Sequence, residues 1–345
     1  MPSSLIWKKY SQAFAKKGKK EGHSKEYIHT CLNYAEQLYK RSAPIIFDPV
    51  HFSLLVGYSP KYIMAVTNSP DNFYRQFSIS KKNGGSRNIT EPLPSLKEIQ
   101  HWILTNILNN IPVSKYAKAY ISKESIKSNA RFHRKQPTVL CLDIKDFFGS
   151  IHGGIIFNLF RTIGYRSSIA SLLTNLCIYD DALPQGAPTS PALSNIIMKG
   201  FDQRAAGFCK KREIRYTRYA DDLTFSGTFF PKEIIRFITS ALSDLKMDLN
   251  PTKTRILGQG QQQRVTGIVV NEKMQVPRKT RRNLRQSIFY IKKYGISSHQ
   301  NHEKIYKSNY VRHLLGIANH ILFINPKDAD ALNALSVLKP LLNKK

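Results

Sequence analysis

The sequence predicts an α+β fold, in which helices back an antiparallel sheet and a basic helical module follows. Hydrophobic residues make up 41% of the 345 residues and aromatic residues 11%, enough to bury a substantial core. The middle of the chain alternates between strand-like and helix-like patterns in the order β-α-α-β-β-α. Beyond residue 275 the composition shifts to helical segments rich in lysine and arginine.

The net charge predicts a polyanionic partner. The chain carries 53 lysine and arginine residues against 23 acidic residues, a formal net charge of +30. A field this positive favours nucleic acid, because each phosphate that a protein neutralises releases condensed counterions. Ribosomal proteins and nucleases share this property, so the charge identifies a class of partner and not a reaction.

The pattern of apolar residues and cysteines excludes several classes of protein. No stretch approaches the roughly 20 apolar residues of a membrane span, and no signal-peptide core follows the start. The four cysteines are widely scattered and form no CxxC pair: Cys31, Cys141, Cys177 and Cys209. We therefore expect no membrane partner, no zinc ribbon and no disulfide framework, and a reducing cytoplasm as the location.

Residues 1–72 are expected to form a basic helical region. Residues 1–22 contain one acid and six lysines, which form either a solvated helix face or an arm that contacts phosphates. The six are Lys8, Lys9, Lys16, Lys17, Lys19 and Lys20. Short helices are expected from residue 25 to residue 70, separated by Pro44 and Pro60.

Residues 73–92 predict a β-hairpin. Alternating segments flank the sequence NGG at 83–85, which favours the positive φ angles of a tight turn. Three basic residues lie near the tip: Lys81, Lys82 and Arg87. A helix is expected to begin at Ser95, where Ser95 and Glu98 match a capping box, and to position the hairpin.

The middle of the chain predicts the sheet and its helices. The apolar run VLCLDI at 139–144 is typical of a buried strand, and residues 214–227 hold two more runs around an acidic pair. Because the turn at that pair is tight, these two strands are expected to be antiparallel. Helices are expected at 155–177, at 192–209 and from Pro231, with a proline-rich loop at 183–191.

The C-terminal part, residues 276–345, is expected to be a helical, basic module. Residues 276–312 hold ten lysines and arginines and one acid. The remainder carries an apolar stripe at helical spacing: Leu314, Leu315, Ala318, Ile321 and Leu322. We place a domain boundary near residue 275.

Carboxylates cluster at the ends of the predicted strands. Asp143 and Asp146 end the first strand, and Asp221 and Asp222 lie between the other two. Buried acids are normally neutralised by cations, because an unpaired one costs several kcal/mol. Three carboxylates on neighbouring strands can hold two Mg²⁺ ions about 3.5–4 Å apart, which suits phosphoryl or nucleotidyl transfer. The alternative is a pair of turn aspartates that hydrogen-bond their own backbone.

Five ordered motifs resemble those of the reverse transcriptases. They are KKNGGSRNI (81–89), DIKDFF (143–148), LPQGAPTSP (183–191), YADD (219–222) and NPTKT (250–254). The resemblance covers about residues 73–270. It implies a right-hand polymerase fold, with fingers and palm at 73–275, an antiparallel palm sheet, and a helical thumb at 276–345 that binds RNA and duplex.

Two further motifs resemble those of retron reverse transcriptases. NARFH (129–133) matches an NAxxH motif ahead of the first catalytic strand, and VTG (265–267) matches a triplet after the palm. Alone, the first would be a satisfied pair on a helix face and the second a turn. Together with the five reverse transcriptase motifs and the compact length of the chain, they indicate a resemblance to the retron enzymes in particular.

The resemblance implies a catalytic role for five positions. Asp143, Asp221 and Asp222 match the metal-binding triad, and the backbone carbonyl of Ile144 would be a further ligand of two Mg²⁺ ions. Lys253 matches a lysine near the leaving pyrophosphate, where it would act as a general acid. Asp146 is expected to lie outside the triad, with a salt bridge to a finger lysine as its alternative role.

The resemblance also implies a nucleotide pocket. Lys82 and Arg87 match finger residues that grip the incoming triphosphate, where arginine offers two parallel hydrogen bonds. Phe148 matches an aromatic steric gate that excludes a ribose 2′-OH and so selects dNTPs. Gln185 and Gly186 match the loop that lines the pocket.

RNA contacts are expected from the two retron motifs and from the thumb. The positions are Asn129, His133, Val265, Thr266, Gly267, Arg278, Arg281, Arg282 and Arg285. Replacing Arg281 and Arg282 with alanine is expected to weaken RNA binding and to flatten its dependence on salt, because fewer counterions are released.

The function that the resemblance implies is RNA-directed DNA synthesis on a dedicated structured non-coding RNA. A guanosine 2′-OH of that RNA would be the primer, and the product would be branched msDNA. The resemblance further implies anti-phage defence in the bacterial cytoplasm, with a separate effector protein and with host RNase H as partners.

Two other functions compete with this interpretation. One is a prokaryotic reverse transcriptase of the group II intron or abortive-infection type. The other is a non-catalytic scaffold that only binds RNA. The intact set of three carboxylates argues against the scaffold, because buried acids are unfavourable without a cation.

Overall fold

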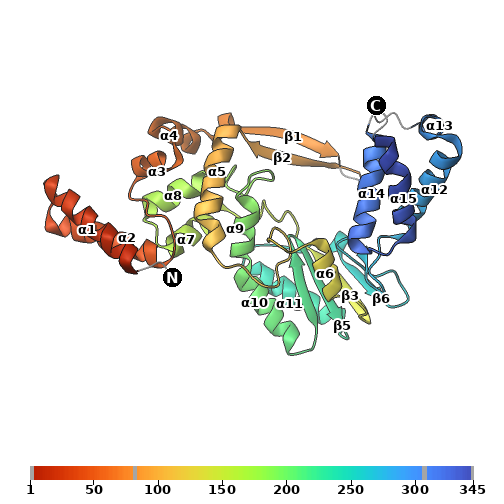
Figure 1. Cartoon of the computed structure of the whole chain (residues 1–345). Helices are drawn as coiled ribbons and strands as arrows, with labels where there is room; N and C mark the ends of the chain where they lie inside the picture. The colour runs from red at the N-terminus through yellow and green to blue at the C-terminus, as the bar shows by residue number, and fades with distance from the viewer. Residues whose placement is uncertain (1–3, 81–83, 305–308, 343–345) are drawn as a thin grey trace. The chain divides into compact units, whose positions relative to one another are not determined.

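The computed structural model describes residues 4–80, 84–304 and 309–342 (Figure 1). The chain divides into two compact units, each assembled from three segments. The first unit comprises residues 1–115, 144–204 and 241–248, and the second comprises residues 116–143, 205–240 and 249–345. The division into an N-terminal region, fingers with palm, and thumb stays a prediction.

Four helices form the N-terminal part of the first unit, and α2, α3 and α4 have clear start signals. They are α1 (Ser4–Lys20), α2 (Lys25–Lys40), α3 (Pro49–Val56) and α4 (Pro60–Asn68). The side chains of Ser24, Asp48 and Ser59 each accept a hydrogen bond from a backbone amide in the first turn of the helix that follows. The short helices expected between residues 25 and 70 are therefore confirmed.

The predicted β-hairpin is also confirmed. After a short 3₁₀ helix (Pro70–Phe73), β1 (Tyr74–Ser80) and β2 (Ser86–Pro92) pair antiparallel along their whole length. Gly84 and Gly85 of the turn have φ angles of 86° and 79°, a region that glycine enters without steric cost.

The helix α5 (Pro94–Asn106) follows the hairpin, but its start differs from the prediction. The residue before the helix is Leu93, whose side chain makes no capping hydrogen bond. Glu98 instead accepts a hydrogen bond from the Tyr58 hydroxyl at 2.6 Å. The predicted capping box of Ser95 and Glu98 is therefore wrong, because the helix begins one residue earlier, at a proline that needs no amide partner there.

Two of the expected helices are each divided in two. α7 (Gly153–Ile163) and α8 (Ser167–Asn175) replace the helix expected at 155–177, because Gly164 adopts a φ of 113° and ends α7. The helix expected at 192–209 is likewise replaced by a pair. That pair is α9 (Ser190–Ile197) and α10 (Lys199–Lys210).

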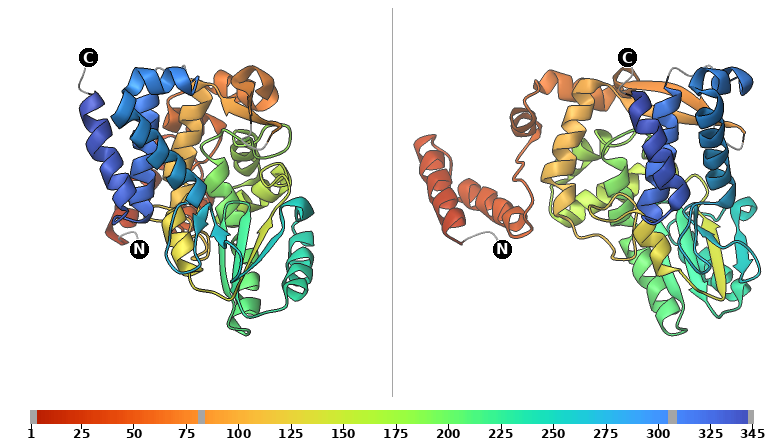
Figure 2. Two further views of the ribbon diagram at one scale, coloured as in Figure 1. Left: turned by 90° about the vertical axis from the view of Figure 1, so that its right-hand side faces the viewer. Right: turned by 45° about the vertical axis from the view of Figure 1, so that its right-hand side comes forward.

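A four-stranded antiparallel sheet forms the centre of the second unit, in the strand order β4-β5-β3-β6. The strands are β3 (Thr138–Asp143), β4 (Arg215–Tyr219), β5 (Asp222–Gly227) and β6 (Arg255–Gly258). The three predicted strands are confirmed, and β6 is an addition whose four residues are too short a run to signal a strand. Figures 1 and 2 show α10 and α11 (Pro231–Ser243) along one side of this sheet.

Helices and a short hairpin complete the second unit. They are α6 (Ile126–Phe132), β7 (Arg264–Val265), β8 (Ile268–Val269), α12 (Arg278–Tyr294), α13 (Ile296–His302), α14 (Tyr310–Ile324) and α15 (Ala329–Leu342). The apolar stripe of α14 shares one hydrophobic core with Val139 and Cys141 of β3. Within the described ranges, no helix is both long and apolar enough to cross a membrane.

Candidate active site

Three carboxylates meet at one end of the sheet in the second unit. Asp143, the last residue of β3, lies directly opposite Asp222, the first residue of β5. Asp221 precedes Asp222 in the connection between β4 and β5. Ligand oxygens of the three residues lie within 4.8 Å of one another, and Asp143 is 5% exposed. The structure thus brings the three predicted carboxylates together.

A strained two-residue turn presents the acidic pair. Tyr219 pairs with Asp222, so Ala220 and Asp221 make the turn. Ala220 has a φ of 57°, in the left-handed region that costs a residue with a Cβ about 1–2 kcal/mol. Such strain gathers at functional sites, where the surrounding structure holds it in place. The acidic pair therefore straddles the end of the turn and does not form the turn by itself.

The electrostatics of the three carboxylates fit a divalent cation. Burial raises the pKa of Asp222 to about 6, with further contributions from the charges of Asp221 and Asp143, while Arg255 and Lys253 act in the opposite direction. A cation held between the carboxylates would remove this repulsion. Clustered carboxylate oxygens are also the ligands that hard divalent ions prefer.

Lys253 lies against this cluster although 110 positions separate it from Asp143 in the chain. Its Nζ donates to both carboxylate oxygens of Asp143 at 2.8 Å. The contact depends on a local link, because the Asn250 amide donates to the Asp143 carbonyl at 2.8 Å. The predicted NPTKT segment therefore supplies the cation beside the first carboxylate.

Arg255 is a residue of this site that sequence reasoning missed. It is the first residue of β6, lies opposite Cys141 on β3, and its charge lowers the pKa of Asp222. The sequence feature that could have indicated Arg255 was its position two residues after Lys253. Only the pairing of β6 with β3 connects it to the carboxylates.

The residues expected to bind the nucleotide fall in the first unit, where three of them lie on adjacent elements. The Thr90 amide on β2 donates to the Gln185 carbonyl at 2.9 Å, which joins the hairpin to the loop at 183–189. Gly186 has a φ of 144°, and a Cβ there would lie 2.7 Å from the Thr90 carbonyl oxygen. Glycine is therefore required at this position. Arg87 is exposed on the same strand, β2.

The remaining predicted positions follow the first catalytic strand. Ile144 is buried, and so is Phe147, whereas Phe148 is only half-buried, with the two phenyl centroids 5.5 Å apart. Asp146 is exposed, with a φ of 42°. Lys82 lies outside the described residues.

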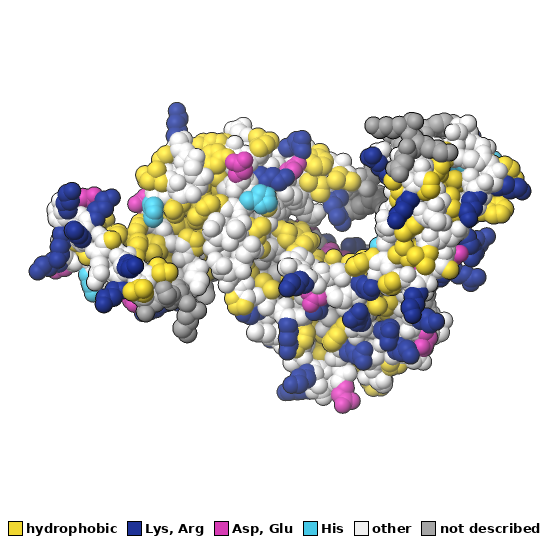
Figure 3. Space-filling view, viewed as in Figure 1, with side chains coloured by type: hydrophobic (Ala, Val, Ile, Leu, Met, Phe, Trp, Pro, Cys, Tyr) yellow, Lys and Arg dark blue, Asp and Glu magenta, His cyan; other side chains and the backbone are white. Residues whose placement is uncertain are grey.

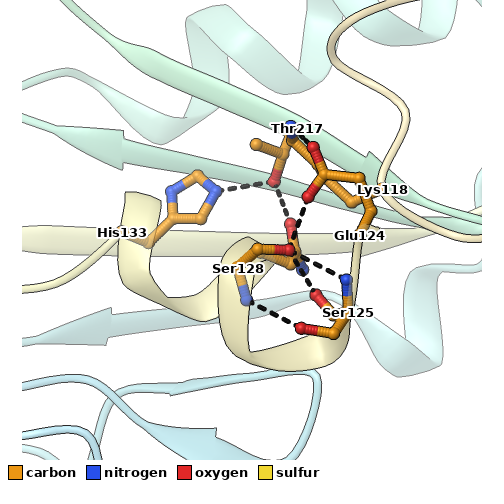
Figure 4. A network of polar contacts seen from close by, with 7 residues as sticks. Lys118, Glu124, Ser125, Ser128, His133 and Thr217 are labelled. Atoms are coloured by element: carbon orange, nitrogen blue, oxygen red, sulfur yellow. Dashed lines mark hydrogen bonds and ion pairs between the residues drawn. The ribbon is translucent and has the colours of Figure 1, made fainter. Parts of the chain in front are cut away.

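The first and last residues of the NARFH segment are buried in a polar network, whereas Arg131 and Phe132 are exposed. Asn129 and His133 are both 0% exposed. His133 Nδ1 lies 2.7 Å from the Ser226 Oγ. Its Nε2 lies 2.7 Å from the Thr217 Oγ1 (Figure 4). Thr217 in turn donates to the Asn129 Oδ1 at 2.6 Å. Direct contact of these two side chains with RNA, as the sequence predicted, is incompatible with this burial.

The same network determines the protonation of His133. Thr217 has one hydroxyl proton and donates it to the asparagine, so the hydroxyl accepts from Nε2–H, and Ser226 then donates to Nδ1. Burial, with a smaller contribution from Arg215, lowers the pKa of His133 to about 3. A neutral His133 therefore ties α6 to the two strands that carry the acidic pair.

The VTG segment divides between core and surface. Val265 is 0% exposed and belongs to the core, so the RNA contact predicted for its side chain is wrong. Thr266 and Gly267 form the turn between β7 and β8, with φ angles of 45° and 82°. Gly267 is exposed and Thr266 half-buried.

The arginines of α12 lie on two faces of the helix. Arg278 and Arg282, four positions apart, are exposed. Arg281 Nε lies 2.9 Å from the Oδ2 of buried Asp328, an ion pair without hydrogen-bond alignment. Arg281 is therefore held by an internal ion pair although it lines the surface, and its RNA contact stays a prediction. These arginines line a surface groove of about 970 Å³, together with Lys279, Asn283, Arg285, Gln286 and Asp330.

Comparison with known proteins agrees with this arrangement. Residues 79–270 match the family model for reverse transcriptase (RNA-dependent DNA polymerase). The chain is 31% identical over 309 residues to the retron Ec86 reverse transcriptase of Escherichia coli, a match that covers 88% of this chain and 91% of that protein. It is 34% identical over 256 residues to the retron Mx162 reverse transcriptase of Myxococcus xanthus, over 64% of this chain and 53% of that longer protein.

A third relative extends the comparison. The retron Mx65 reverse transcriptase of Myxococcus xanthus is 32% identical over 279 residues, which cover 75% of this chain and 63% of that protein. The family match spans more than half of the chain and includes the three carboxylates. The chain belongs to the retron reverse transcriptases, and it is an RNA-directed DNA polymerase with the right-hand polymerase fold.

Proposed function

We propose that this enzyme copies a dedicated structured non-coding RNA and uses a guanosine 2′-OH of that RNA as its primer. The product is branched msDNA, joined to the RNA by a 2′,5′-phosphodiester. The observation that carries the proposal is the carboxylate cluster of Asp143, Asp221 and Asp222, within 4.8 Å, in a chain that belongs to the retron family.

Two Mg²⁺ ions, when bound, would activate the attacking hydroxyl and stabilise the leaving oxygen. Asp143, Asp221 and Asp222 would hold them, with the carbonyl of Ile144 as a further ligand. Lys253, which the structure places beside Asp143, would donate a proton to the leaving pyrophosphate.

Selection of the nucleotide would come from the first unit. Arg87 on β2, together with Lys82, would grip the triphosphate, because a guanidinium offers paired hydrogen bonds to phosphate. Gln185 and Gly186 would line the pocket, and the link between Thr90 and Gln185 supports this assignment. Phe148, half-buried beside buried Phe147, would exclude a ribose 2′-OH.

RNA recognition would use the exposed basic face of α12, with the turn at Thr266 and Gly267. Arg278, Arg282 and Arg285 are exposed there and line the groove of about 970 Å³. Positive side chains in a groove attract phosphates without reading sequence. Asn129 and His133 would act indirectly, by holding α6 against β4 and β5.

In the cell, we place this synthesis in anti-phage defence in the bacterial cytoplasm. A separate effector protein would be held inactive by the complex, and host RNase H would remove the copied template. The msDNA and its RNA would remain bound to the enzyme. Loss of plaque reduction in a variant without the acidic pair, alongside normal protein levels, is the expected result in a phage infection assay.

Extraction of nucleic acid from the purified protein tests the central proposal. The chain is expressed with its flanking genomic DNA, and the extract is treated with RNase A or DNase I and run on a denaturing gel. The expected result is a discrete single-stranded DNA that shrinks slightly under RNase A. A variant with Asp221→Asn and Asp222→Asn should lose this DNA by about a thousandfold or more, because metal-ion catalysis is worth several kcal/mol.

The matched control is Asp146→Asn, an exposed acid outside the cluster whose φ of 42° suits asparagine. It should retain the DNA product. RNA alone in every sample would overturn the proposal and favour a scaffold that only binds RNA. DNA of mixed length that resists RNase A would instead indicate a reverse transcriptase of another prokaryotic type.

A further inference from the structure

The N-terminal helices of the first unit enclose a cavity that the polymerase reaction does not use. Its volume is about 540 Å³, within the range of small-molecule sites. It is bounded by α1, α2 and the segment that leads into α3. The lining residues with aromatic or apolar side chains are Tyr10, Phe14, Tyr27, Ile28, Ile45 and Phe47.

A continuous run of rings forms one wall of this cavity. The ring centroids of Phe14 and Phe47 lie 5.5 Å apart in a stacked arrangement, and Phe47 stacks on His51 at 5.5 Å. Tyr10 extends the run from Phe14 at 6.1 Å. Tyr27, which is 54% exposed, also lines the cavity. A flat ring that enters the cavity therefore meets aromatic side chains from α1, α2 and the segment before α3.

Polar groups stand at the edge of this cavity in both donor and acceptor form. The phenol of Tyr10 has its pKa raised by burial and by the neighbouring Cys31 thiol, so it stays a neutral donor at physiological pH. Glu21 and Asp48 supply carboxylate oxygens beside Lys17 and the His51 amide, and Lys17 supplies a cation. A heteroaromatic ring with hydrogen-bonding edges matches this set of donors and acceptors.

The surroundings of the cavity are strongly basic. α1 holds six lysines and no acid in its 17 residues. Figure 3 shows several lysine and arginine side chains around the α1–α2 end of the chain. Of the lysines of α1, Lys17 lines the cavity. Aromatic rings beside basic side chains are the features by which proteins bind unpaired bases of single-stranded nucleic acid.

The geometry points to a binding site for an unpaired nucleobase of single-stranded nucleic acid in the cavity between α1, α2 and the start of α3. The base stacks on the exposed ring of Tyr27 and packs beside Phe14 and Phe47, and lysines of α1 take the flanking phosphates. This site is separate from the polymerase chemistry, and the inference does not rest on the proposed msDNA synthesis.

Tryptophan fluorescence gives a local readout of this site. Of the two tryptophans, Trp7 lies 5.6 Å from Tyr10, a wall residue, and Trp102 lies in α5. The Trp102→Phe variant of the full chain therefore reports only from Trp7. It is titrated, without metal or dNTP, with single-stranded octamers of deoxyadenylate or deoxythymidylate, and with an abasic octamer that carries the same phosphates.

We expect the base-bearing octamers to quench Trp7 and to bind about fivefold or more tightly than the abasic octamer, since stacking of one base is worth ~1–3 kcal/mol. Tyr27→Ala should remove this difference, and Phe47→Leu should reduce it. Leu54→Ala, an exposed apolar side chain of α3 outside the cavity, should leave it unchanged. If Phe47→Leu does not fold, the titration of Tyr27→Ala alone tests the inference, because Tyr27 is exposed and its replacement should not disturb the fold.

Two outcomes would overturn the inference. Equal affinity for abasic and base-bearing octamers would mean that only the lysines bind. A base preference that survives Tyr27→Ala would place the bases elsewhere. Extension of an annealed primer on an RNA template, measured with the same variants, separates this site from the polymerase, because failure of DNA synthesis leaves the Trp7 titration unaffected.

Discussion

Asp143 and Asp222 face each other across β3 and β5, which sets two like charges directly opposite in a largely buried position. Such a pair destabilises a sheet unless cations compensate it. Lys253 and Arg255 supply that compensation from the segment that follows α11. At the scale of single residues, the closeness of the carboxylates therefore lowers the stability of the fold. In the absence of a metal ion, Lys253 and Arg255 reduce the repulsion between them.

Removal of the Lys253 charge should make the metal site tighter. In Lys253→Met the ammonium no longer occupies both oxygens of Asp143, so we expect the affinity for Mn²⁺, used as a probe, to rise several-fold. Isothermal titration calorimetry measures this, with Lys273→Met, an exposed lysine, as control. Weaker binding of Mn²⁺ in Lys253→Met would show that the lysine supports the metal instead.

Protonation of His133 should weaken the fold in acid. Its pKa is about 3 in the folded chain and near 6.5 when unfolded, so below pH 6.5 only the unfolded state gains the proton. The free energy of unfolding should fall by about 2 kcal/mol between pH 7 and pH 5 from this group. Urea unfolding of the parent chain and of His133→Gln at both pH values measures the effect. An equal fall in both proteins would contradict the assignment.

At the scale of elements, the helical spacing of the arginines of α12 places some of them toward solvent and one of them against a buried acid. Arg278, Arg282 and Arg285 are exposed, whereas Arg281 turns toward the start of α15 and pairs with buried Asp328. Arg285 also lies 3.7 Å from Asp330 but stays exposed. Asp328 also caps the start of α15 by accepting from the amide of its third residue at 3.1 Å. One face of α12 therefore remains available to phosphates, and the other fastens two helices together.

The two faces of α12 should respond differently to substitution. Arg278→Ala with Arg282→Ala should reduce the slope of log K against log salt for RNA binding by about 1–2, with little change in stability. Arg281→Ala should lower the free energy of unfolding by about 1–3 kcal/mol, because it leaves buried Asp328 without its cation. Salt titrations and urea unfolding separate the two. A slope that changes only in Arg281→Ala would reverse the assignment.

At the scale of the whole molecule, the basic C-terminal helices and the catalytic sheet are not independent. Val139 and Cys141 of β3 belong to the same hydrophobic core as Leu284 of α12 and Leu314 of α14. The alternation along β3 sends Val139 and Cys141 to that side and Leu140 and Leu142 to the other. Both faces of the catalytic strand are therefore buried.

A chain that ends at residue 275 should fail to fold. It would expose the apolar face of β3 and the side chains of Val265, Ile268 and Val270, all of which are 0% exposed in the full chain except Cys141 at 5%. Solubility after expression, circular dichroism and size-exclusion chromatography of the short and full chains measure the outcome. A soluble, monomeric and cooperatively unfolding short chain would contradict the shared core.

The sequence by itself determined the β-hairpin at 74–92, the three central strands and the carboxylate cluster, because local patterns specify each of them. Turn glycines, apolar alternation and a strand–turn–strand around two acids need no distant partner to be recognised. The family motifs located the remaining candidates of the site, and the nucleotide pocket among them stays a prediction.

Tertiary structure alone decided which of the motif residues reach the surface. His133 is polar and Val265 is apolar, yet residues that lie far away in the chain bury both. Arg281, which remains partly exposed, pairs with the distant and buried Asp328. The pairing of β6 with β3 likewise brings Arg255 to the carboxylates. Whether a side chain at these positions is buried or exposed depends on long-range packing and on the hydrogen bonding of buried polar groups. Neither can be read from the spacing of a local motif.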